Sequence, residues 1–246
     1  MDHYIYVGMS GATETHRAQQ IKMNNLANAN TPGFRADFSE IVGRKLEGGG
    51  FDSRSFAILD RVSSNLQVGS IRATGLDLDV ALSDGAWFAV TNTNGELRYS
   101  RRGDFTVDID GFLRDGAGNQ IMGSGGPINI PPSQKIDIGG DGTISIIPFG
   151  SNPDEKVVLD QIKTIVPKPE DIFKAADGLF ALKPDSVLQD TPVMMRSGYL
   201  EESNVNPILA LFDMLQLANH HELNLRMIEM AKQNDEVSSQ LLRVGA

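Results

Sequence analysis

The chain has 246 residues, of which 40% are hydrophobic and 22% charged, and its formal net charge at pH 7 is −10. This composition is typical of a folded globular protein and excludes general disorder, and the acidic balance argues against nucleic acid as a partner. The sequence contains no cysteine, which excludes disulfides and cysteine-ligated metals. Its apolar runs are shorter than the ~20 residues of a membrane-spanning helix, so we expect no membrane insertion.

Residues 2–28 have the periodicity of an α-helix. Positions at alternating spacings of four and three form a heptad pattern that is apolar except at two places: Ile5, Met9, Ala12, His16, Gln19, Met23 and Leu26. Gly8 and Gly11 each weaken a helix by up to ~1 kcal/mol relative to alanine, but they would let another helix come close. We therefore expect this helix to be ordered only against a partner. An ordinary first helix packed on its own domain is the alternative.

The segment Asn28-Ala29-Asn30-Thr31-Pro32-Gly33 predicts the end of this helix. Asparagine tolerates left-handed backbone, the residue before proline is disfavoured in a helix, and glycine permits a turn. Phe34 and Phe38 could then anchor the segment that follows. Residues 47–64 include three consecutive glycines and several serines and arginines, which predicts a loop or connector.

From residue 75 the apolar period changes to two, which indicates half-buried strands. The predicted strand segments are 76–82, 87–90, 97–99, 105–109, 128–130, 136–138, 144–146, 157–166, 179–182 and 193–196. Turn signals separate them, among them Asn94-Gly95 and Asp110-Gly111. Short strands with frequent turns predict an antiparallel β body.

The C-terminal segment predicts a second, longer helix. Ser203 or Asn204 could cap it, and Pro207 suits an early helical position. A first apolar stripe contains Ile208, Leu211, Leu215 and Ala218, and a second, apolar except at Asn234, contains Leu223, Met227, Met230, Asn234, Val237, Leu241 and Val244. A helix over 208–244 would be roughly 55 Å long. Because a compact β body does not need such a length, we expect part of the stripe to face another helix or another subunit.

No residue pattern supports catalysis. His220-His221-Glu222 lacks the second histidine, four positions on, that a zinc-protease helix requires. Asp108-Ile109-Asp110-Gly111 has its glycine too early for an EF-hand loop and predicts a β-turn. The acidic pairs Glu201-Glu202 and Asp77/Asp79 are interpreted as exposed surface features. We expect no enzyme, no cofactor and no metal site.

Three segments resemble the axial proteins of the bacterial flagellum, the rod and hook subunits. Asn24–Phe34 is similar to their N-terminal motif, Thr74–Ala81 with Tyr99–Phe105 to their central β domain, and Gly198–Asn206 to their C-terminal motif. Met9–Ala12 and Asn30–Phe38 look most like a proximal-rod subunit. A distal-rod or hook-type subunit is the alternative, and a soluble β-rich binding module is a further one from another class.

The predicted fold is α+β, a mainly antiparallel β body flanked by terminal helices that form a coiled-coil assembly region. The expected segments are 1–35 (N-terminal helix and motif), 36–74 (connector), 75–200 (β domain) and 201–246 (C-terminal helix). The predicted assembly residues are Ile5, Met9, Ala12, Met23, Leu26, Asn28, Asn30, Thr31, Pro32, Gly33, Phe34, Ser203, Asn204, Asn206, Leu211, Leu215, Leu223, Met227, Met230, Val237 and Leu241.

The resemblance implies further properties that the residue pattern alone does not give. It implies export by the flagellar type III apparatus without a cleaved signal, and a location in the periplasm within the basal body. It also implies helical assembly with copies of the chain and with adjacent rod proteins. The implied function is mechanical: to transmit torque and to enclose the export channel.

Overall fold

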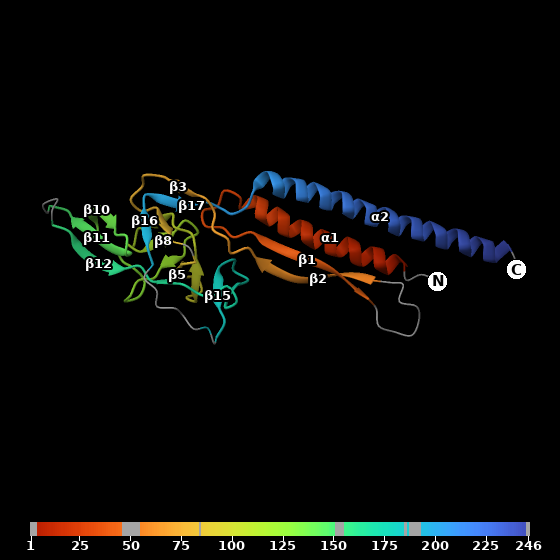
Figure 1. The fold of residues 1–246 in the computed structure, drawn as a ribbon, viewed down its shortest axis with the longest axis horizontal. Helices are drawn as coiled ribbons and strands as arrows, with labels where there is room; N and C mark the ends of the chain where they lie inside the picture. Colours follow the sequence, from red (N-terminus) through yellow and green to blue (C-terminus); the bar gives the residue numbers. More distant parts are fainter. Residues whose placement is uncertain are drawn as a thin grey trace. The chain divides into compact units, whose positions relative to one another are not determined.

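The computed structural model describes residues 4–45, 55–83, 85–150, 155–184, 186 and 193–244. The chain forms two compact units, which are described separately. The helical unit comprises Met1–Asn28, Asp37–Ser63 and Val205–Ala246, and the β unit comprises Ala29–Ala36 and Ser64–Asn204. Two terminal helices and a central antiparallel β body confirm the predicted α+β class (Figure 1).

The helical unit contains two helices and a small sheet. Helix α1 spans Tyr4–Ala27 and helix α2 spans Pro207–Val244. Strands β1 (Asp37–Lys45) and β2 (Ser55–Ser64) pair with each other, and β1 contacts α1. The predicted loop over 47–64 is therefore wrong for residues 55–64, because Phe56, Ile58 and Val62 give this segment enough β-forming residues to extend along β1. Residues 47–54 of that prediction lie outside the described part.

The β unit is built around one large antiparallel sheet and a smaller one. The large sheet has the order β14–β15–β6–β5–β9–β8–β7, with β13 also paired to β5. Its strands are β5 (Trp87–Thr91), β6 (Leu97–Ser100), β7 (Phe105–Val107), β8 (Leu113–Asp115), β9 (Gln120–Ile121), β13 (Thr164–Ile165), β14 (Ile172–Lys174) and β15 (Phe180–Leu182). The smaller sheet is β10 (Ser133–Ile138), β11 (Thr143–Pro148) and β12 (Val157–Gln161).

Strand β5 is the centre of the β unit because both of its faces are buried. Phe88 and Val90 point into one apolar cluster, where Phe88 contacts Phe105 edge-on with ring centroids 5.0 Å apart. Trp87 and Ala89 point into a second cluster on the other face. A strand with apolar residues at successive positions is expected where neither face meets water. The predicted turns at Asn94-Gly95 and Asp110-Gly111 join β5 to β6 and β7 to β8, with positive φ at both glycines.

Two short antiparallel pairs complete the β unit. Strand β4 (Val80–Leu82) pairs with β16 (Met195–Ser197), and β3 (Ile71–Ala73) pairs with β17 (Tyr199–Glu201). The predicted strand 76–82 is wrong over its first residues, because the Asp79 amide bonds the Leu76 carbonyl and makes a turn there. Asp79, expected at the surface, is buried, whereas Asp77 is exposed.

Candidate assembly interface

Helices α1 and α2 lie side by side in the helical unit (Figure 1). Their close approach depends on the predicted small residues. A Cβ on Gly8 would stand 2.9 Å from Cγ1 of Ile228, and one on Gly11 would stand 3.2 Å from Oδ1 of Asn224. The partner of α1 within this chain is therefore α2.

Polar contacts fix the register of this helix pair. Asn224 Nδ2 lies 3.3 Å from Oγ1 of Thr15, and Lys22 Nζ lies 2.6 Å from Oδ2 of Asp213. His221 Nδ1 lies 3.2 Å from the Ala12 carbonyl oxygen. These three contacts can form together in only one register of the two helices.

The side of α2 that faces away from α1 carries a second apolar surface. At 100° per residue, the positions against α1, such as Ala210 and Ile228, lie half a turn away from a row of exposed side chains. We call this row the outward stripe: Ile208, Phe212, Leu215, Leu223, Met230 and Val237, each at least half exposed. Helix α2 is apolar on two opposite sides, and the described residues of the chain cover only the side that faces α1.

The predicted assembly residues fall into three groups. Exposed are Met9, Met23, Asn30, Asn206, Leu211, Leu215, Leu223, Met230 and Val237; half-buried are Ile5, Leu26, Asn28, Thr31, Pro32, Phe34, Ser203, Asn204 and Met227; buried are Ala12 and Gly33. The side chain of Leu241 is outside the described part. The predicted residues of α2 thus lie mostly on its open side, whereas Gly33, Phe34 and Asn204 make contacts inside the β unit. Their part in assembly stays a prediction.

Gly33 is held by backbone contacts that exclude any side chain. Its φ is +66°, and a Cβ would stand 2.4 Å from backbone atoms of Arg101. Its amide donates to the Glu201 carbonyl at 2.8 Å. The next side chain, Phe34, lies beneath the Lys174 ammonium, 4.5 Å from Nζ to the ring centroid. The end of the N-terminal motif is therefore packed into the β unit.

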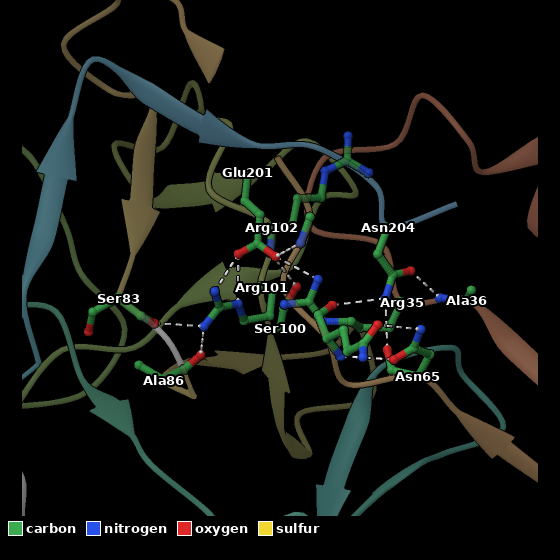
Figure 2. A network of polar contacts seen from close by, with 12 residues as sticks. Arg35, Ala36, Asn65, Ser83, Ala86, Ser100, Arg101, Arg102, Glu201 and Asn204 are labelled. Carbon is green, nitrogen blue, oxygen red and sulfur yellow. Dashed lines mark hydrogen bonds and ion pairs between the residues drawn. The ribbon is translucent and has the colours of Figure 1, made fainter. Parts of the chain in front are cut away.

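A buried cluster of three charges adjoins this segment, and we call it the arginine–glutamate cluster: Arg35, Arg101 and Glu201 (Figure 2). Arg35 Nη1 lies 2.5 Å from Oε1 of Glu201. Arg101 binds Oε2 of Glu201 through Nε, at 2.9 Å, and through Nη2. Each of the three residues is at most 3% exposed, so the expectation that Glu201 lies at the surface is wrong.

Arg101 and Glu201 make further contacts with several elements. Arg101 Nη1 donates to the carbonyls of Ser83, at 3.0 Å, and Ala86, and the Gly69 amide donates to Glu201 at 3.1 Å. Burial lowers the pKa of Arg35, while Glu201 opposes that shift. The arginines lie at least 100 positions from Glu201 along the chain, so the sequence carried no local signal for the cluster.

Asparagines hold the segments next to the helices. Asn204 accepts from the Ala36 amide at 2.7 Å and donates to the carbonyls of Asn65 and Gln67, both at 2.9 Å. Asn25, which the sequence analysis did not select, exchanges two hydrogen bonds with the backbone of Asp37. Neither asparagine caps α2.

The N-cap of α2 is Asn206. Its Oδ1 accepts from the amides of Ile208, at 3.0 Å, and Leu209, at 3.2 Å, and Pro207 occupies the first helical position. The predicted cap at Ser203 or Asn204 is therefore wrong by two or three residues, because the chain up to Asn204 still belongs to the β unit.

The described ranges lack two features that would indicate other kinds of function. No helix within them has an apolar stretch long enough to cross a membrane. The same ranges hold no group of three or more histidine, aspartate or glutamate side chains placed to bind a metal ion.

Models of three protein families match separate parts of the chain. The flagella basal body rod protein model matches residues 5–35, the flagellar hook protein FlgE/F/G D1 domain matches 81–146, and the flagellar basal body rod FlgEFG protein C-terminal model matches 196–241. These matches cover α1 with its following motif, much of the β unit, and most of α2.

Curated relatives match over the full length. The flagellar basal-body rod protein FlgF of Salmonella typhimurium is 32% identical to this chain and that of Escherichia coli 33%, with all of each chain covered. FlgG of Buchnera aphidicola is 30% identical over 91% of this chain and 95% of its own. The similarity at both helical ends and in the β unit shows that the chain belongs to the FlgF family of flagellar basal-body rod proteins.

Proposed function

We propose that this structural subunit of the flagellar rod assembles by packing the outward stripe of α2 against terminal helices of neighbouring rod subunits. The observation that carries the proposal is the open apolar side of α2, which runs from Ile208 to Val237. Burying one such side chain contributes roughly 1.5–3 kcal/mol, so six of them supply a substantial driving force. Exposed apolar surface on this scale marks an interaction site.

The neighbours are copies of this chain and adjacent rod proteins. A contact between two different surfaces that does not close into a ring produces a helical assembly. In such a tube the terminal helices line the export channel and transmit torque. The subunit reaches the periplasm through the flagellar type III apparatus without a cleaved signal; this part rests on the family resemblance.

The test places a carboxylate on the outward stripe. Leu223→Asp and Met230→Asp should leave the purified chain folded, since both positions are exposed, and should prevent rod formation in cells that lack the native protein. His220→Asp is the matched control, because it puts the same charge at an exposed position of α2 about a quarter turn from the stripe. Basal bodies are counted by electron microscopy. Normal rods in the Leu223→Asp strain would overturn the proposal.

A further inference from the structure

The chain passes between its two units at four places, after residues 28, 36, 63 and 204. Three of these places lie next to residues that are tied together within the β unit. Asn204 binds the backbone of Ala36 and of Asn65, and the Asn65 amide donates to the Ala36 carbonyl at 2.7 Å. The segments that lead to β1, to β2 and to α2 therefore share one point of attachment in the β unit (Figure 2).

Glu201 also binds the segments that contain Ala36 and Asn65. Its carbonyl accepts from the Gly33 amide, and its carboxylate binds Arg35, so it holds the segment that follows α1 twice. The carboxylate also binds the Gly69 amide and Arg101. Glu201 itself lies four residues before the chain enters the helical unit on its way to α2.

Arg101 links Glu201 to residues next to the central strands of the β unit. Its guanidinium donates to the carbonyls of Ser83 and Ala86, just before the central strand β5, and Arg101 directly follows β6. Arg35 lies with its guanidinium carbon 5.9 Å from the centroid of the Trp87 ring, at the start of β5. The cluster is therefore bonded to residues that directly flank β5 and β6, two central strands of the large sheet.

A buried ion pair contributes little net stability compared with apolar packing, but separating its charges inside the protein is costly. Separating the charges of such a cluster therefore costs more free energy than the cluster adds to the net stability of the fold. We propose that the arginine–glutamate cluster is a mechanical anchor, through which force applied to the terminal helices is taken up by the centre of the β unit. The proposal rests on the proposed function, because it requires the helices to carry load from neighbouring subunits.

The test compares a buried with an exposed arginine–glutamate pair. Arg35→Met removes one partner of the cluster, and Arg35→Lys keeps the charge but loses the planar guanidinium. The control is Arg72→Met, because Arg72 pairs with the adjacent Glu202 at 3.0 Å with both side chains largely in solvent. Hydrogen exchange on the full chain follows the amides of Gly33, Ala36 and Asn65, with the amides of β5 as the reference for the fold.

We expect Arg35→Met to speed exchange of the three amides at least tenfold, Arg35→Lys to speed it less, and Arg72→Met to leave it unchanged, with β5 protected throughout. In cells, the Arg35→Met protein should build rods and allow swimming in dilute medium. In viscous medium, where torque is high, it should lose motility and shed hooks with their filaments. The Arg72→Met strain should swim in both.

Three results would overturn the anchor. Unchanged exchange in both Arg35 variants would show that the cluster does not hold these segments. If Arg72→Met sped exchange of the three amides as much as Arg35→Met, burial of the ion pair would not be what holds these segments. Loss of β5 protection in both Arg35 variants would make the cluster a requirement for folding. Failure of the proposed function is separate: it would appear as normal rods with Leu223→Asp, whatever the exchange at Gly33.

Discussion

Two constraints act together on the residue at position 33. The backbone is left-handed there, which costs a residue with a side chain about 1–2 kcal/mol, and the Arg101 backbone occupies the space of a Cβ. Glycine satisfies both. Because the Gly33 amide binds Glu201, any shift that relieved the clash would also disturb the arginine–glutamate cluster.

Gly33→Ala should therefore destabilise the β unit by more than its backbone angle alone explains. Gly75 is the matched control, because its φ is +73° and a Cβ added there would meet no atom within 4 Å. We expect Gly75→Ala to lower the free energy of unfolding by about 1–2 kcal/mol, and Gly33→Ala to lower it by at least about 1 kcal/mol more. Urea unfolding of the purified chain measures both values. If both variants lost the same free energy of unfolding, the structure would accommodate an alanine side chain beside Arg101 without further cost.

At the scale of elements, α2 begins through the side chain of Asn206, which satisfies two amides that the helix cannot bond internally. The first turn and the residues directly after it include Ile208 and Phe212 of the outward stripe. An ordered first turn therefore presents the start of this stripe before any neighbour has bound.

Asn206→Ala should cost about 1 kcal/mol of local stability, because the amides of Ile208 and Leu209 lose their acceptor. Hydrogen exchange should rise in the first turn of α2 and stay unchanged near Ala231. Ser203→Ala serves as the control, since Ser203 was one of the two predicted caps and Asn206 is the observed one. If the serine variant alone raised exchange in this turn, the assignment of the cap would be wrong.

The sequence predicted the elements with strong periodicity and missed those whose signal is not local. Both helices and the central strand β5 were recognisable, because their apolar spacing reports which faces are buried. Strand β2 was missed because it contains three serines, which are typical of loops, and follows a glycine-rich segment of the sequence. Glu201 was misplaced at the surface because its partners, Arg35 and Arg101, become neighbours only after folding.

On the scale of the whole molecule, the two units have different kinds of surface and interior. The β unit encloses its apolar clusters, whereas α2 in the helical unit keeps an apolar row open along most of its length. Most of the negative charge lies between the terminal helices in sequence, so the helical ends can associate with little repulsion. This division suits the assembly through the chain ends that we propose.

The most direct measurement is photo-crosslinking in assembled basal bodies, with a photoreactive amino acid placed at position 223 or 237 of the outward stripe. Assembly through the stripe predicts covalent products with neighbouring rod subunits from both positions, and much less product from position 220 on the flank of the same helix. Equal crosslinking at 220, or none at 223 and 237 in intact rods, would contradict the central claim.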